Sequence, residues 1–233
     1  MIRRIVTNGC SWMEGMGVTS QEIAGGKLEH RLSALLSKRF TADDINLALP
    51  GGSNDRILRT TTDWFAQNKL LNHNETFVLI GLTQIARTET FYNVDDSWAR
   101  ITATQDYYDI DNLKEYFKLK FKWTHTFQND YERLARNIIA ISSICEYYGA
   151  RYLIFDAFAN LNEWESNGLA YHKRSLAEFF RDNTNIYLDE SWDEWNREEY
   201  YAKGDDGHPN ALGNKEWCKH LINYLKKHKI MPI

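Results

Sequence analysis

The chain has 233 residues, of which 43% are hydrophobic and 26% are charged, a balance typical of a folded globular protein. This composition excludes an intrinsically disordered chain, which would carry too little apolar surface to form a core. The formal net charge of −4, with acidic and basic residues interspersed, argues against a nucleic-acid partner, because phosphate binding usually needs a basic patch.

The three cysteines are widely spaced, and no two of them form a Cys-x-x-Cys pair. This spacing argues against a disulfide framework and favours a reducing compartment. The opening Met-Ile-Arg-Arg is not followed by an apolar stretch of signal-peptide length, and no segment approaches the roughly 20 apolar residues of a membrane span. We therefore expect a cytoplasmic protein without a membrane span.

The first part of the chain alternates short apolar runs with amphipathic segments. Residues 2–7 form a mostly β-branched run that predicts a buried parallel strand, and a glycine-rich stretch with a short helical piece follows it. Residues 27–40 carry leucines at helical spacing and predict a helix. Residues 45–49 predict a second strand, which a Pro-Gly-Gly sequence ends.

The middle of the chain predicts a helix, a central strand and an insertion. Residues 53–55 are a good N-cap cluster for a helix that extends to Leu71. Residues 76–82 form a continuous apolar run, which implies burial on both faces and hence a central strand. Periodicity weakens over residues 84–123, which we interpret as an insertion or lid over the edge of the sheet, with a helix near residues 112–119.

The last part of the chain returns to regular alternation. Gly149 is placed to end a long amphipathic helix in the left-handed conformation. The further elements expected here are helices at residues 125–148, 175–180 and 211–227 and strands at residues 151–155 and 185–188. Strands that alternate with helices predict a three-layer α/β/α sandwich around a mainly parallel five-stranded sheet. No repeat or linker divides the chain, so we expect a single domain over residues 1–233.

Residues suited to hydrolysis follow the predicted strands. Ligands of such sheets bind at the carboxyl ends of the strands, where Ser11, Gly51 and Thr83 are expected. A serine hydroxyl needs a base that takes its proton and groups that stabilise an oxyanion. His208 is the candidate base, and Asp205 lies three residues before it, where it could hold the other ring nitrogen.

These residues fall into four blocks in a fixed order along the chain. The blocks are Gly9-Cys10-Ser11, then Asn46 through Pro50-Gly51-Gly52-Ser53-Asn54, then Gly81-Leu82-Thr83-Gln84, and last Asp205-x-x-His208-Pro209-Asn210. In these blocks the sequence resembles the SGNH hydrolases, also called the GDSL family.

The resemblance implies a flavodoxin-like α/β/α fold and the hydrolysis of esters or thioesters through Ser11, His208 and Asp205. It also implies an oxyanion hole formed by the backbone N–H groups of Ser11 and Gly51 and by an Asn side chain of the third block. Gly52 is an alternative to Gly51 in this role.

Two positions depart from the pattern of the family. Cys10 replaces the Asp of the first block, and we interpret it as a small buried residue rather than a nucleophile. Thr83 replaces the Asn of the third block, and the loss of one oxyanion donor can cost about 3 kcal/mol of transition-state stabilisation. Thr83 itself, Gln84 or Arg87 could supply the third donor. The alternative for Arg87 is a structural ion pair with Glu89.

The predicted activity is that of a carboxylesterase or a carbohydrate O-deacetylase, with a small-molecule or carbohydrate ester as substrate. The predicted substrate contacts are Asn54, Arg87 and Trp12. The alternative is an inactive SGNH-like module that binds a carbohydrate or an acylated ligand. No cofactor or metal is expected, because the other histidines are scattered without ligand spacing. Aromatic residues in the expected loops either cover the core or form a surface on which a sugar ring stacks, Trp98 among them.

Overall fold

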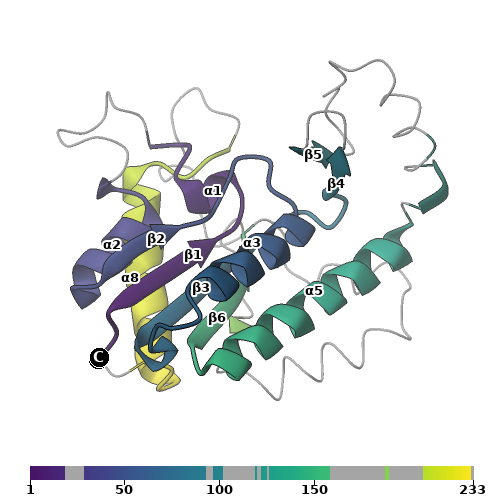
Figure 1. Ribbon diagram of the computed structural model, residues 1–233. Helices are drawn as coiled ribbons and strands as arrows, with labels where there is room; N and C mark the ends of the chain where they lie inside the picture. The colour runs from purple at the N-terminus through teal and green to yellow at the C-terminus, as the bar shows by residue number, and fades with distance from the viewer. Residues whose placement is uncertain are drawn as a thin grey trace.

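One parallel sheet organises the molecule (Figure 1). The computed structural model describes residues 1–18, 29–92, 97–101, 119, 122–124, 126–157, 187–188 and 207–231. The sheet has the strand order β2-β1-β3-β6-β7, and each neighbouring pair is parallel. This confirms the predicted mainly parallel five-stranded sheet, in the order typical of flavodoxin-like folds. Its strands are β1 (Arg4–Asn8), β2 (Asp43–Asn46), β3 (Thr76–Leu82), β6 (Arg151–Asp156) and β7 (Tyr187–Leu188).

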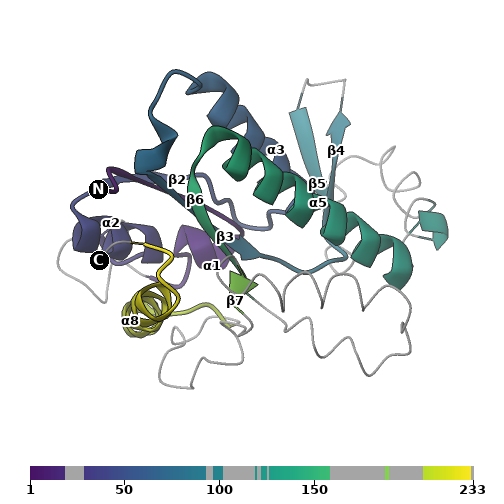
Figure 2. The same cartoon turned by 90° about the horizontal axis from the view of Figure 1, so that it is seen from below.

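Helices cover both faces of the sheet, which gives three layers (Figure 2). One face carries α2 (Leu32–Phe40), α8 (Ala211–Lys227) and the short α1 (Ser11–Glu14), and the other carries α3 (Asn54–Gln67) and α5 (Phe127–Tyr148). Side chains of the central strands alternate between the two faces, as the period of a strand requires. On β3, for example, Phe77 and Leu79 face α2 and α8, whereas Val78 and Ile80 face α3 and α5.

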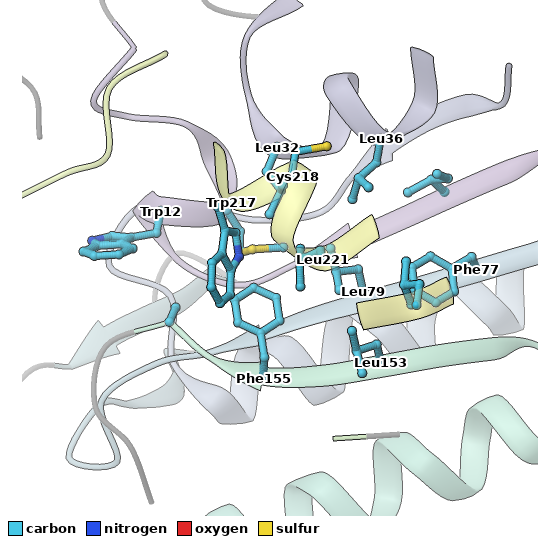
Figure 3. Close-up of a cluster of buried hydrophobic side chains, with 14 of the residues drawn as sticks. Trp12, Leu32, Leu36, Phe77, Leu79, Leu153, Phe155, Trp217, Cys218 and Leu221 are labelled. Atoms are coloured by element: carbon cyan, nitrogen blue, oxygen red, sulfur yellow. The ribbon is translucent and has the colours of Figure 1, made fainter. Parts of the chain in front are cut away.

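The core under α8 is packed around a tryptophan (Figure 3). Trp217 on α8 contacts Phe155 on β6, with ring centroids 5.5 Å apart, and neither side chain is exposed to solvent. Leu36 on α2 and Leu79 on β3 complete this part of the core. Full burial of a side chain of this size stabilises the fold by about 1.5–3 kcal/mol.

The helix boundaries follow from residues that cap them. Ser53 accepts the backbone N–H of Arg56 at the start of α3, and Thr126 accepts that of Asn129 at the start of α5. Gly149 ends α5 with a φ of 73°, the left-handed conformation predicted for it. The last helix has the predicted bounds, and the predicted long helix begins two residues late because Thr126 caps it.

Three expectations need correction. The second strand is not at residues 45–49, because β2 ends at Asn46, whose side-chain oxygen accepts the N–H of Ala48 at 2.9 Å and turns the chain away from the sheet. The helix predicted to reach Leu71 ends at Gln67. Within the predicted insertion, the structure contains an antiparallel hairpin, β4 (Thr88–Tyr92) and β5 (Ser97–Ile101), where no strand was expected.

Some expectations fall outside the described residues. The predicted helix at residues 175–180 lies wholly outside them, and the one at residues 112–119 lies outside them except for Leu119. The single domain with a lid over residues 84–123 stays a prediction. Among the helices of the described ranges, none combines the length and the apolar character that a membrane crossing requires.

A histidine is buried at the amino end of the sheet. His73 is 3% exposed and lies among Trp64, Phe65 and Tyr148, with ring centroids 4.9 to 5.5 Å away. Its Nε2 lies 3.0 Å from the carbonyl oxygen of Asn68. Burial lowers the pKa of His73 below its ordinary value of 6.5, and the charge of Arg4 acts in the same direction, against the raising effect of the Asn68 carbonyl. The folded protein therefore holds the neutral imidazole.

We expect this histidine to make the folded state less stable in acid. The unfolded chain binds the proton more readily, so the stabilisation is fully present above pH 6.5 and is lost as the pH falls below that value. The free energy of unfolding, measured by urea titration between pH 7.5 and 5.5, should fall with pH in the wild type and fall less in His73→Phe. An equal pH dependence in the two proteins would contradict this assignment.

Candidate active site

A buried asparagine fixes the end of β1, where the candidate site begins. The Nδ2 of Asn8 donates to the carbonyl oxygen of Ile57 at 3.1 Å and to the hydroxyl oxygens of Thr60 and Thr61 at 2.8 and 3.0 Å. Its Oδ1 accepts the N–H of Gly9 at 2.9 Å. These bonds hold the end of β1 against α3. No role was predicted for Asn8, although a polar residue at the end of an apolar strand was a signal.

Ser11 lies on a compact turn directly after β1. It is the first residue of α1 and is 6% exposed. Its carbonyl oxygen accepts the N–H groups of Gly15 and Met16, both at 3.0 Å, and Gly15 has a φ of 87°, which favours glycine. A Cβ at Gly9 would lie 2.3 Å from Cγ of Met13, so only glycine lets α1 pack against the strand end.

The second block lies against the first. The N–H of Leu49 donates to the carbonyl oxygen of Gly9 at 3.3 Å. A Cβ at Gly52 would lie 3.1 Å from that same oxygen, so the two glycine turns touch through their backbones. The N–H of Gly52 is used within its own turn, where it donates to the Leu49 carbonyl oxygen at 2.9 Å. Of the two alternatives for the oxyanion donor, this geometry favours Gly51.

The third block is fixed by the side chain of Asn54. Its Oδ1 accepts the N–H of Thr83 at 3.0 Å, and its Nδ2 donates to the Thr83 carbonyl oxygen at 2.9 Å. Both ends of the Asn54 amide are therefore bonded to the Thr83 backbone, and Asn54 is only 3% exposed. Contact between Asn54 and a substrate stays a prediction. Arg87 donates through Nη1 to the Thr83 hydroxyl oxygen at 2.9 Å, whereas the side chain of Gln84 is exposed.

Cys10 is the fully buried residue next to Ser11. Burial raises the pKa of its thiol above the ordinary 9.0, against opposing effects from a backbone hydrogen bond at Trp12, the positive charge of Arg87, and hydrogen bonds with the Thr83 and Ser11 side chains. The thiol is therefore protonated at neutral pH, which fits the predicted role of a small buried residue. The side chains of Thr83 and Ser11 both act on this one thiol.

The turn that carries His208 packs against the segment after α1. A Cβ at Gly17 would lie 2.8 Å from Cβ of His208 and 2.5 Å from the carbonyl oxygen of Pro209. Gly17 is six residues beyond Ser11, so the His208 turn, near the end of the chain, contacts the segment that follows the Ser11 turn. Asp205 lies outside the described residues, and its role as orienter stays a prediction.

Two asparagines that sequence reasoning did not single out as site residues hold this turn. Asn210 caps α8 by accepting the N–H of Gly213 at 2.8 Å. The fully buried Asn214 donates to the carbonyl oxygens of Pro209 and Asn210 at 3.2 and 2.9 Å. Its Oδ1 accepts the N–H of Leu32 at 3.2 Å, which ties the turn to the start of α2.

The hairpin that follows the third block is anchored to α3. Glu89 is 8% exposed, and its carboxylate accepts two bonds from Arg59, at 2.7 and 2.9 Å, which raises the pKa of Arg59. The expected alternative, an ion pair of Glu89 with Arg87, is therefore replaced by one with Arg59. Thr88 donates to a carboxylate oxygen of Asp55 at 2.8 Å, a second tie between hairpin and helix.

This hairpin presents a pair of aromatic rings to solvent. Phe91 and Trp98 are cross-strand partners, with ring centroids 5.4 Å apart, and are 45% and 44% exposed. The guanidinium of Arg59 lies 4.4 Å from the centroid of the Trp98 ring. In Figure 1 the hairpin lies beyond the carboxyl end of β3, the end of the sheet that carries α1.

The structure thus brings Ser11, Gly51, Thr83 and Arg87 to the carboxyl end of the parallel strands, beside the His208 turn. Trp12 is 2% exposed and belongs to the core under α8, so substrate contact by its ring stays a prediction. In the described part of the chain, no three His, Cys, Asp or Glu residues are grouped so that they could hold a metal ion.

The model of a family of unknown function, DUF6071, matches residues 20–175 of the chain. A search of curated proteins found no match to this chain. Among solved structures, TesA is similar over 97% of this chain and 99% of its own, with 13% identity and a TM-score of 0.56.

An acetyl xylan esterase from the rumen bacterium Butyrivibrio proteoclasticus is similar over 98% of this chain and 65% of its own, with 11% identity and a TM-score of 0.56. This chain therefore spans about two thirds of that esterase. A lipolytic protein of the G-D-S-L family from Desulfitobacterium hafniense is similar over 95% of this chain and 99% of its own, with 11% identity and a TM-score of 0.51. At such identities the likeness shows the fold, which is that of the SGNH hydrolases.

The burial of the thiols leads to a simple test. Cys10, Cys145 and Cys218 are all buried, and burial raises the pKa of the latter two to about 12. We expect N-ethylmaleimide at pH 7.5 to modify none of them in the folded protein and all three after denaturation, because the thiolate is the reactive form. Peptide mass spectrometry identifies the modified residues. Fast, selective labelling of Cys10 in the native protein would argue for a reactive thiol instead.

Proposed function

The chain belongs to DUF6071, a family of unknown function, and we propose that it acts as a serine esterase of the SGNH type. The observation that carries this proposal is the position of Ser11, on the turn after β1 and beside β3, with the His208 turn packed against Gly17. In parallel sheets of this order, ligands bind between the carboxyl ends of the two strands where the connections turn to opposite faces. A nucleophile belongs at that point.

The proposed mechanism has two acyl-transfer steps. Oγ of Ser11 attacks the acyl carbon of the ester while His208 takes the serine proton, and Asp205 orients the imidazole. The backbone N–H groups of Ser11 and Gly51 donate to the oxyanion of the tetrahedral intermediate. The intermediate collapses, the alcohol leaves with the proton from His208, and Ser11 keeps the acyl group. Water then attacks the acyl-serine in the same way and releases the acid.

On the alcohol side, we propose a carbohydrate. The exposed pair of Phe91 and Trp98 supports this, because an aromatic face binds the apolar face of a sugar ring. The ion pair of the half-buried Arg59 on α3 with Glu89 on β4 ties the hairpin to the helix and puts polar groups beside the aromatic pair, as sugar hydroxyls require. The fold similarity to an acetyl xylan esterase agrees with a carbohydrate O-deacetylase.

The second candidate function is an inactive module that binds the same kind of ligand. The substitution at Thr83, where the resemblance calls for Asn, favours it. Both candidates predict ligand binding by the hairpin, but only the esterase predicts a nucleophilic Ser11. The two are therefore separated by the chemistry of that serine.

We expect the purified protein to hydrolyse 4-nitrophenyl acetate and a fluorophosphonate probe to label Ser11. Ser11→Ala and His208→Ala should each lower kcat by at least about 10⁴-fold, because the triad acts as a unit. Ser33→Ala is the matched control, since Ser33 is a buried serine on α2 that accepts a bond from Asn46. Equal rates for wild type and Ser11→Ala, without labelling of Ser11, would favour the inactive module.

The carbohydrate assignment has its own test. Trp98→Ala should raise KM for acetylated xylo-oligosaccharides about tenfold or more, since loss of one stacked ring costs roughly 1–3 kcal/mol by analogy with base stacking. Rates with 4-nitrophenyl acetate should stay unchanged, because this substrate does not reach the hairpin. Trp123→Ala is the control, because Trp123 is 71% exposed but lies outside the hairpin. Equal KM values for wild type and Trp98→Ala would remove the sugar from the proposal.

A further inference from the structure

Arg87, three residues beyond the third block, brings a cation to the position where an amide is expected. Thr83 stands in the place of the Asn side chain, and its hydroxyl oxygen accepts a hydrogen bond from Nη1 of Arg87 at 2.9 Å. Gln84 is exposed, and the amide of Asn54 is committed to the Thr83 backbone. In the loop of residues 83–87, Arg87 is the charged residue, and its guanidinium keeps its positive charge at any working pH.

The loop that carries Arg87 is fixed along its length. Asn54 on α3 binds both the N–H and the carbonyl oxygen of Thr83. The N–H of Arg87 closes a turn on the carbonyl oxygen of Gln84 at 3.1 Å. From α5, Arg133 donates to the carbonyl oxygen of Ile85 at 2.7 Å. A group that is held in advance stabilises a developing charge without the cost of reorganisation.

The charge of Arg87 also reaches the residue next to Ser11. The buried thiol of Cys10 has Thr83 and Ser11 as hydrogen-bond partners, and the positive charge of Arg87 lowers the pKa of this thiol, although burial raises it overall. Ser11 and Thr83 are 6% and 5% exposed, so a charge at Arg87 acts on them with little screening by solvent. An oxyanion formed at Ser11 would lie in the same surroundings.

On the basis of the proposed function, we infer that Arg87, supported by the Thr83 hydroxyl, replaces the third-block amide as the residue that stabilises negative charge at Ser11. The guanidinium offers N–H donors and a full positive charge, so its hydrogen bond to an oxyanion is stronger than that of a neutral amide. The Thr83–Arg87 pair then compensates for the missing Asn, and the site is complete without it.

Steady-state kinetics test this role. Arg87→Met should lower kcat for 4-nitrophenyl acetate by about 10²–10³-fold with little change in KM, as expected for an interaction made in the transition state. Introducing Thr83→Asn into the Arg87→Met protein should restore part of kcat. The matched control is Arg4→Met, because Arg4 donates to the Thr76 hydroxyl at the other end of β3. An Arg87→Met enzyme with wild-type kcat would overturn the inference.

A binding measurement does not depend on catalysis. Calorimetric titration with methylphosphonate, an anion shaped like the tetrahedral intermediate, should show binding to wild type and Ser11→Ala and at least about tenfold weaker binding to Arg87→Met. If no ester is hydrolysed but this dependence on Arg87 is seen, the proposed function fails and the anion site stands. If methylphosphonate does not bind, or binds equally to Arg87→Met, the inference is overturned. Thermal melting of each variant checks that it is folded.

Discussion

The parallel pairing of β1 with β3 is the constraint on which the rest of the molecule depends. Both strands are buried in the centre of the sheet, and their connections leave toward opposite faces, through α1 and α2 after β1 and toward α5 after β3. The chain therefore diverges between their carboxyl ends, and the space that opens there has to be lined by loops. Thr83 directly follows β3, and Ser11 begins α1 shortly after β1 ends at Asn8, which is why the candidate chemistry gathers at this point.

Neutral amide side chains hold the loops in place. Asn8, Asn54 and Asn214 each use both the donor and the acceptor end of a buried amide, and each joins a loop of the site to a helix. An amide suits this task because it satisfies a backbone N–H and a carbonyl at once without burying a charge. Loss of the Asn54 side chain, for example, would remove a partner from both the N–H and the carbonyl group of Thr83, at about 1–3 kcal/mol each.

The sequence predicted the parts of the fold that depend on local pattern. Residues 76–82 form a continuous run without charged residues, Gly149 ends an amphipathic segment and residues 211–227 are amphipathic, so the central strand and the two long helices were recognisable. β2 was placed too late because its sequence, Asp43–Asn46, is polar and pairs on one side with β1, while the more apolar residues after it form the turn. The hairpin and the partners of the amides could not be predicted, because they depend on contacts between segments far apart in sequence.

In the proposed site, the bonds of Asn54 explain how the third block can differ from the family pattern while its loop keeps its position. Because the Asn54 amide holds the backbone of Thr83 and not its side chain, the position of this loop does not depend on which residue occupies position 83. A change from Asn to Thr at position 83 therefore alters the hydrogen-bond donor but does not move the loop that carries it. A threonine is too short to reach far, but its hydroxyl can orient a longer side chain, and Arg87 is four residues away on the same fixed loop. In the proposed site, positioning falls to Asn54 and the donation of charge falls to Arg87.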